Sequence, residues 1–210
     1  MRSTVVELNT ASTDRIERPR EPSRRLFFAL WPDPVQQVAF AHAARKAVKA
    51  SGGRPVAMKN IHLTLVFLGS VAETKILAVT SIARHVAAAF PQGATPLAFE
   101  FERLEHWKKA RVLCAVPSVE TLMTTADVPL PAAGVLADAL RAELVSGGFA
   151  PDLKAFRPHV TLARSVVHPT DSDPMSAALW SFGAFALVQS QTASRGAVYS
   201  VLDSFPLGRH

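Results

Sequence analysis

The chain has 210 residues and a formal net charge of +6, with 49% hydrophobic and 19% charged residues. This balance is ordinary for a globular protein of one large domain or two small lobes. The single cysteine, Cys114, excludes an intrachain disulfide and a cysteine-based zinc site, and no apolar stretch approaches the ~20 residues that cross a bilayer. We therefore expect a reducing, cytoplasmic setting in which Cys114 is a small buried hydrophobe.

The beginning of the chain differs in composition from the rest. Residues 1–23 mix Arg, Glu, Pro, Ser and Thr with little periodicity, which is typical of a flexible leader. We interpret residues 24–207 as a single domain and residues 208–210 as a tail.

Hydrophobic periodicity and turn residues predict the elements in order. Strands are predicted at 25–31, 61–68, 97–101, 111–116, 159–163, 182–189 and 197–202, and helices at 35–49, 72–89 and 132–145. A turn is predicted at 105–109, and loops at 117–131, which holds three prolines, and at 168–175. This order predicts an α+β fold with two similar lobes, in which two antiparallel sheets flank a central cleft and the helices lie outside.

Two predicted strands carry the same short pattern. Residues 62–65 read His-Leu-Thr-Leu and residues 159–162 read His-Val-Thr-Leu. Since strand side chains alternate between faces, the His and the Thr of each motif project together while the apolar residues enter the core. Two such motifs, one in each half of the chain, predict a cleft with two imidazoles and two hydroxyls.

This set of groups suits a phosphodiester. The hydroxyls of Thr64 and Thr161 can donate hydrogen bonds to phosphate oxygens, and the imidazoles of His62 and His159 titrate near neutral pH. Hydrolysis needs one imidazole to accept a proton from water and the other to protonate the leaving oxygen. The symmetry of the motifs leaves open which histidine has which role.

A structural role competes with this interpretation, because a single histidine on a half-buried strand is more often hydrogen-bonded within the fold. The coincidence of two motifs favours a site. The other histidines are expected to have surface or packing roles: His42 and His85 in helices, His106 and His168 in loops, and His210 at the end. We expect no metal at the site, because threonine is a weak metal ligand and neither motif contains a carboxylate.

Further residues near the motifs are candidates for substrate contacts. The guanidinium of Arg164 could neutralise a phosphate. Strict alternation would place the side chain of Arg164 on the face of the strand opposite to that of His159. A role in phosphate binding therefore requires the strand to end or twist near residue 163. Four aromatic residues are candidates for stacking on a base: Phe28, Trp31, Trp107 and Phe156. Phe28 is expected to lie in the core. Trp107 lies in a predicted turn, where it could contact the substrate at the rim of the site or be exposed by accident.

The chain resembles the bacterial RNA 2′,3′-cyclic phosphodiesterases of the two-histidine (2H) phosphoesterase superfamily, historically described as 2′-5′ RNA ligases. The resemblance rests on residues 25–30, 60–69, 157–164 and 199–207, and it covers most of residues 24–207. It implies a bilobal α+β fold and cofactor-free, metal-independent opening of a 2′,3′-cyclic phosphate at an RNA end to a 2′-phosphate. It also implies that His62 is the general acid, that His159 is the general base, and that Thr64, Thr161 and Arg164 hold the phosphate.

Two alternatives remain open. The same groups could carry out 2′-5′ RNA ligation, or hydrolysis of another cyclic or 2′-5′ substrate. A non-catalytic RNA-binding module is the second alternative. The expected partners are RNA ends or oligonucleotides that carry a cyclic phosphate, with no membrane partner, and the protein is expected to act as a monomer.

Overall fold

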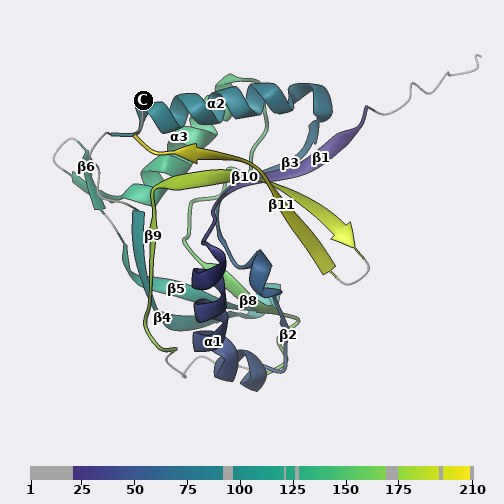
Figure 1. The fold of residues 1–210 in the computed structure, drawn as a ribbon, viewed down its shortest axis with the longest axis vertical. Helices are drawn as coiled ribbons and strands as arrows, with labels where there is room; N and C mark the ends of the chain where they lie inside the picture. The colour runs from purple at the N-terminus through teal and green to yellow at the C-terminus, as the bar shows by residue number, and fades with distance from the viewer. Residues whose placement is uncertain are drawn as a thin grey trace, which may run out of the picture.

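The computed structural model describes residues 21–91, 97–120, 122–125, 128–168, 175–193 and 196–208. Its strands are β1 Ser23–Leu30, β2 Arg54–Pro55, β3 Leu63–Ala72, β4 Leu97–Trp107, β5 Val112–Glu120, β6 Leu122–Thr125, β7 Val128–Pro131, β8 Val160–Arg164, β9 Ala178–Phe182, β10 Ala184–Ala193 and β11 Gly196–Pro206. Its helices are α1 Pro34–Ala50, α2 Ile76–Ala89 and α3 Ala132–Ser146 (Figure 1). The predicted α+β class is confirmed. Residues 1–20 of the predicted leader, 169–174 of the second predicted loop and 209–210 of the predicted tail lie outside the described residues.

The strands form two antiparallel halves that meet at one point. The order across the main sheet is β11-β10-β1-β3-β8-β5-β4-β9, with β2 beside β8. The half with β11, β10, β1 and β3 joins the half with β8, β5, β4 and β9 through a single residue pair between the strands, Leu63 with Val160. The two predicted sheets are therefore continuous in the structure, and the junction lies between the two motif strands.

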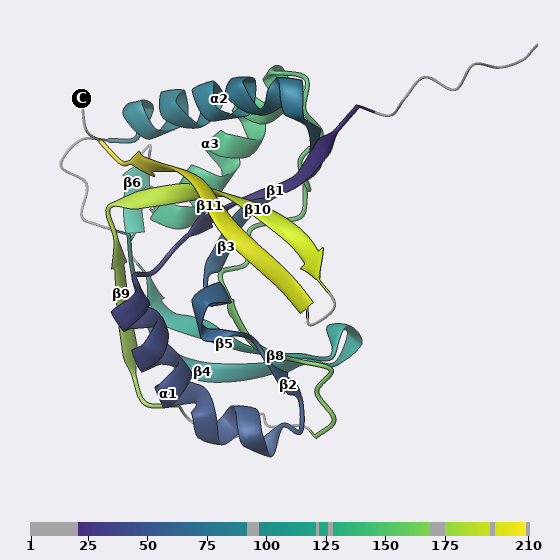
Figure 2. The ribbon, with the colours of Figure 1, turned by 45° about the vertical axis from the view of Figure 1, so that its right-hand side comes forward.

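The helices divide between the halves of the sheet. Helices α2 and α3 contact each other and pack near β11 and β3, whereas α1 packs near β8 and β9 at the opposite end (Figure 2). The ring of Phe40 from α1 contacts those of Phe101 and Trp180, with centroids 5.2 and 4.3 Å apart, in the main core. Among the described residues, no helix is both long and apolar enough to span a membrane.

Local chemistry explains where α1 begins and ends. The side chain of Asp33 accepts a hydrogen bond from Gln36 N at 2.7 Å, and Gln36 Oε1 accepts one from Asp33 N at 3.1 Å, which is a capping box. Pro34 occupies the first turn, where its missing N–H costs no hydrogen bond. After the helix, Gly52 takes φ +60°, a left-handed conformation that ends helices and favours glycine.

The predicted loop at 117–131 is wrong. Strand β5 continues to Glu120, and β6 pairs with β7 in a separate two-stranded sheet. The prolines that predicted a loop lie where strands tolerate them. Pro117 lies at a register shift, beyond the part of β5 that pairs with β8. Pro129 and Pro131 lie in β7, which pairs with another strand on one side only.

The structure also differs from the prediction at β3, β9 and β4. Gly69 does not end β3: it takes φ +77° at a register shift and the strand continues to Ala72, as glycine permits in a β-bulge. Strand β9 was not predicted, although the alternation of exposed Leu179 with buried Trp180 is a strand pattern. Strand β4 extends to Trp107, so the turn begins at residue 108, and His106 lies in a strand rather than in a loop.

Candidate active site

The register of the two motif strands decides where the four motif side chains lie. Leu63 pairs with Val160, and each of these residues directly follows the histidine of its motif. Because paired residues of an antiparallel ladder share a face, both apolar residues enter the core and both His-x-Thr sets project from the opposite face. A slip of one residue would send one of these sets into the core.

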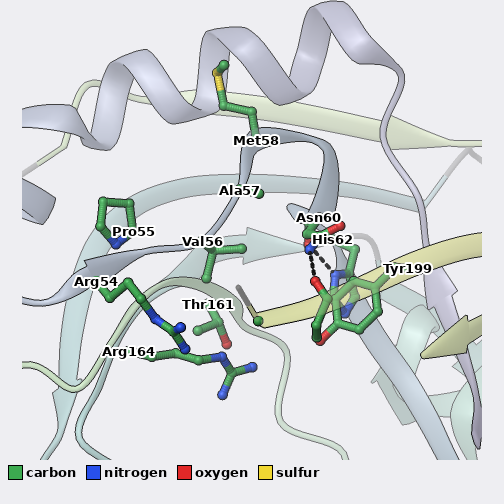
Figure 3. Close-up of a pocket in the computed structure, with 12 residues that line it drawn as sticks. Arg54, Pro55, Val56, Ala57, Met58, Asn60, His62, Thr161, Arg164 and Tyr199 are labelled. Carbon is green, nitrogen blue, oxygen red and sulfur yellow. Dashed lines mark hydrogen bonds between the residues drawn. The ribbon is translucent and has the colours of Figure 1, made fainter. Parts of the chain in front are cut away.

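All five predicted site residues line one cavity of about 350 Å³, the central pocket. Its lining includes His62, Thr64, His159, Thr161 and Arg164, together with Phe27 and Tyr199. Two pockets adjoin it. The side pocket, of about 400 Å³, shares His62, Thr161 and Arg164 and adds Arg54, Val56 and Met58 (Figure 3). The opposite pocket, of about 330 Å³, shares Thr64 and His159 and adds Trp107, Lys154 and Arg157.

A β-bulge brings Arg164 to the face that carries Thr161. Strand β5 pairs Leu113 with Ala163 and Cys114 with Thr161, so one step along β5 corresponds to two steps along β8. The extra residue, Leu162, shifts the alternation of side chains by one position. The strand irregularity that a phosphate-binding role for Arg164 requires is therefore present.

The hydrogen bonds of His62 fix its neutral tautomer. Nδ1 lies 2.6 Å from the carbonyl oxygen of Asn60, and Nε2 lies 3.1 Å from Thr64 Oγ1. A carbonyl can only accept, so Nδ1 carries the proton and the neutral Nε2 accepts from the Thr64 hydroxyl. Burial lowers the pKa of His62 to about 4, and the positive charges of His159 and Arg164 act in the same direction.

Three aromatic rings surround His62 and account for this burial. The ring of Trp31 stacks on the imidazole with centroids 5.2 Å apart and planes 17° apart. Phe27 and Tyr199 contact it from other sides, with centroids 5.0 and 5.2 Å away. Tyr199 comes from β11, and Asn60 holds this strand near the site by donating its Nδ2 to Ala197 O at 2.8 Å.

His159 is oriented in the same way from the second half of the sheet. Its Nδ1 donates to the carbonyl of Arg157 at 2.8 Å, which leaves Nε2 as the acceptor of the neutral ring. The ring of Trp107 covers it, with centroids 4.5 Å apart. Burial lowers the pKa of His159, and the charges of Arg157 and Arg164 lower it further.

Glu105 holds the groups that pack against His159. Its carboxylate accepts from Trp107 Nε1 at 2.8 Å and forms ion pairs with Arg103 and Arg157. The guanidinium of Arg157 in turn lies 4.5 Å from the centroid of the Trp107 ring. The hydrogen bond from Trp107, followed by the two guanidinium charges, lowers the pKa of Glu105. Trp107 is therefore not an accidental exposure, since it is fixed against His159.

Cys114 lies beneath the pocket as a buried thiol, as predicted. Its Sγ is 4.0 Å from Thr161 Oγ1, and burial raises the pKa of the thiol to about 12. A thiol with this pKa is protonated at neutral pH and is a poor nucleophile.

The aromatic candidates separate by strand alternation. Phe28 is fully buried in the main core, as expected, whereas Phe27 belongs to a smaller cluster on the site face with Trp31 and Tyr199. Phe156 packs at the edge of the main core and lines the opposite pocket. The sequence reasoning missed Phe27, Tyr199 and Arg54. Alternation counted back from Trp31 would have found Phe27, but no local signal marks the other two.

Comparison with known proteins gives consistent matches. The model of the LigT like phosphoesterase family matches residues 30–114. Two proteins called RNA 2′,3′-cyclic phosphodiesterase are each 29% identical to the chain. The match to the protein from Thermus thermophilus spans 202 residues and covers 89% of this chain and 92% of the relative. The match to the protein from Escherichia coli spans 143 residues and covers 67% of this chain and 72% of the relative. The crystal structure of E. coli LigT complexed with 3′-AMP matches the fold with a TM-score of 0.72 and 25% identity, covering 90% of this chain and all of that one.

The matches agree in sequence and in fold along nearly the whole chain, and they include the strand that carries the first motif. With that agreement, the chain is similar in sequence and in fold to the LigT-like phosphoesterases.

Proposed function

We propose that the protein hydrolyses 2′,3′-cyclic phosphate ends of RNA to 2′-phosphomonoesters without a metal ion. The observation that carries this proposal is the pairing of Leu63 with Val160, which directs both His-x-Thr motifs into one pocket. The curated relatives named RNA 2′,3′-cyclic phosphodiesterase support the choice of substrate.

In the proposed reaction, His159 and His62 act on opposite sides of the phosphorus atom. Nε2 of His159 accepts a proton from water as the water oxygen bonds to phosphorus. The bond between phosphorus and O3′ breaks, and Nε2 of protonated His62 donates its proton to O3′. The product has a 2′-phosphate and a free 3′-hydroxyl. This division of roles follows the family, because the Nδ1 hydrogen bonds of the two rings are alike.

The hydrogen bond between His62 and Thr64 couples protonation to phosphate binding. In the free enzyme the neutral Nε2 accepts from the Thr64 hydroxyl. Once protonated, Nε2 can no longer accept, so this hydroxyl is free to donate to a phosphate oxygen. The negative phosphate favours this protonation, because a nearby anion raises the pKa of an imidazole. Thr161 and Arg164 complete the set of donors to the phosphate.

An assay with a defined RNA end tests the proposal. An RNA oligonucleotide with a 2′,3′-cyclic phosphate, incubated with the protein and a chelator, is expected to yield only the 2′-phosphate. Enzymes specific for each monoester, followed by mass spectrometry, distinguish a 2′-phosphate from a 3′-phosphate. An unopened ring together with joined 2′-5′ products would favour the ligase alternative. Binding of the RNA without turnover would favour the binding module.

The lowered histidine pKa values predict an unusual pH dependence. Catalysis requires one imidazole protonated and one neutral, so kcat/KM follows a bell centred on the mean of the two free-enzyme pKa values. The pKa of His62 is about 4, and the pKa of His159 is also below its usual value. The maximum of kcat/KM is therefore expected below pH 6.5. The maximum of kcat is expected at higher pH, because the bound phosphate raises both pKa values.

Removing the charge of Arg164 tests this pH dependence, because that charge lowers the pKa of both histidines. Arg164→Gln is expected to move the kcat/KM maximum to higher pH, whereas Lys46→Gln, an exposed charge change on α1, should leave it in place. A wild-type kcat/KM maximum above pH 7 would contradict the assigned pKa directions.

A further inference from the structure

The two motif histidines are held by different surroundings. Three aromatic rings enclose His62, whereas His159 is the last residue of an irregular segment. This segment, residues 147–159, is described throughout and connects α3 to β8 without forming a helix or a strand. The imidazole of His159 is instead held from two sides, by the carbonyl of Arg157 at Nδ1 and by the ring of Trp107.

Glu105 on β4 contacts both groups that hold His159. Its Oε2 accepts hydrogen bonds from Trp107 Nε1, at 2.8 Å, and from Arg157 Nη2. Its Oε1 accepts from Arg103 Nη2 at 3.1 Å. Because the guanidinium of Arg157 also lies over the Trp107 ring, these side chains form one cluster. Glu105 therefore ties the end of the irregular segment to a strand that lies 52 residues earlier in the chain.

The place of Glu105 sets how it can act. It does not line the central, side or opposite pocket among the described residues, so its carboxylate does not reach a phosphate bound there. Its hydrogen bond from Trp107 and the charges of its two arginines lower its pKa, so the carboxylate is ionised at neutral pH. Hydrogen bonds to an ionised acceptor are the stronger kind. Glu105 can therefore influence the reaction only through the side chains that it fixes.

The tautomer of His159 is the property that this cluster controls. The Arg157 carbonyl selects the tautomer with the proton on Nδ1, because a carbonyl can only accept. Nε2 is then unprotonated and can take a proton from water. In the other tautomer Nε2 carries the proton and cannot act as a base, and a wrong tautomer is known to reduce catalysis strongly.

We propose that Glu105 is a positioning residue for His159: through Trp107 and Arg157 it holds the Arg157 carbonyl at Nδ1 and leaves Nε2 as the basic nitrogen. The consequence for catalysis rests on the proposed function, in which His159 is the base, whereas the tautomer itself does not depend on any substrate. Among the described residues, the groups that hold His62 include no carboxylate, so His62 provides an internal comparison.

Proton–nitrogen correlation spectra of the ¹⁵N-labelled protein measure the tautomer of each imidazole. Above about pH 8 both rings are neutral, since both pKa values lie below the usual value. Wild-type His159 is expected in the Nδ1–H form. Glu105→Ala is expected to add a population with the proton on Nε2 of His159 and to leave His62 unchanged. An unchanged His159 tautomer in the folded alanine variant would overturn the inference.

Glu105→Gln gives a second, milder test. Its amide oxygen can still accept from Trp107, but it no longer forms an ion pair with Arg157. A smaller population of the Nε2–H form of His159 is therefore expected than in Glu105→Ala. Should the alanine variant fail to fold, the glutamine variant carries the same test, and the absence of any Nε2–H population in it would overturn the inference.

Kinetics on an RNA end with a 2′,3′-cyclic phosphate measure the consequence. Glu105→Ala is expected to lower kcat about tenfold with little change in KM, less than the ~10²-fold that a displacement of 1 Å can cost. Glu105→Gln should recover most of this loss. The matched control is Glu102→Ala, which removes an exposed carboxylate of β4 that forms no ion pair among the described residues, and it should change neither constant. A raised KM with unchanged kcat in Glu105→Ala would contradict a positioning role.

The two measurements separate this inference from the proposed function. If the wild-type enzyme opens no cyclic phosphate, the proposed function fails, and the spectra still decide whether Glu105 sets the tautomer of His159. If the wild-type enzyme is active but Glu105→Ala keeps both its kcat and its tautomer, the inference fails and the proposed function stands.

Discussion

Replacing either motif histidine with alanine is expected to lower kcat on a 2′,3′-cyclic phosphate RNA end by at least ~10²-fold, the scale of losing a general acid or base. His62→Ala and His159→Ala each remove one of the two proposed proton transfers. The double variant is expected to lose little more than the more damaged single variant, because groups that act as a unit are not additive. Single-turnover rates on labelled RNA measure these losses.

Folding must be controlled separately for the two positions. His62 packs among three aromatic rings, so His62→Gln, which keeps bulk and polarity, accompanies the alanine variant, and thermal unfolding is measured for each. The exposed His42 on α1 supplies the matched control, and His42→Ala is expected to retain the wild-type rate. Full activity in a folded His159→Ala variant would disprove the paired-histidine mechanism.

Removing either motif hydroxyl is expected to have the next largest effect. Thr161→Val keeps the shape of the side chain but removes the hydroxyl that we propose donates to the phosphate oxygens, where charge develops during attack. The expected loss in kcat is on the order of 10²-fold, as for removal of one oxyanion donor. Thr64→Val is expected to act similarly, since we propose that its hydroxyl alternates between His62 and the phosphate.

Serine substitutions test whether the hydroxyl is the cause. Thr64→Ser and Thr161→Ser keep the donor and should retain most of the rate, whereas the valine variants should not. Thr74→Val, in the exposed turn before α2, is the control and should leave kcat unchanged. Equal losses for serine and valine would indicate that the methyl group matters through packing and that the hydroxyl does not act on the phosphate.

Much of the fold follows from local sequence, and the errors have local causes too. The helices are predicted closely because hydrophobic periodicity is a local signal and glycines follow α1 and α3, as at Gly52 and Gly147. The loop predicted at 117–131 was wrong because proline is compatible with strand edges and bulges, which depend on what lies beside the strand. Gly69 likewise marks a bulge that only its partner strand reveals.

The sequence by itself determined what each motif strand presents. Alternation places His62 with Thr64 and His159 with Thr161, and it sends Leu63 and Val160 into the core. These preferences involve only neighbours in the chain, so a single sequence is sufficient to predict them.

The tertiary structure alone decided how these parts meet. The pairing of Leu63 with Val160, the bulge at Leu162 that turns Arg164 to the site, and the approach of Tyr199 on β11 all join segments from distant parts of the chain. Such registers are fixed by packing on both faces of the sheet, because a slip of one residue would exchange buried and exposed side chains. No local pattern records that packing, and for this reason the second arginine of the side pocket, Arg54, emerged only from the folded arrangement.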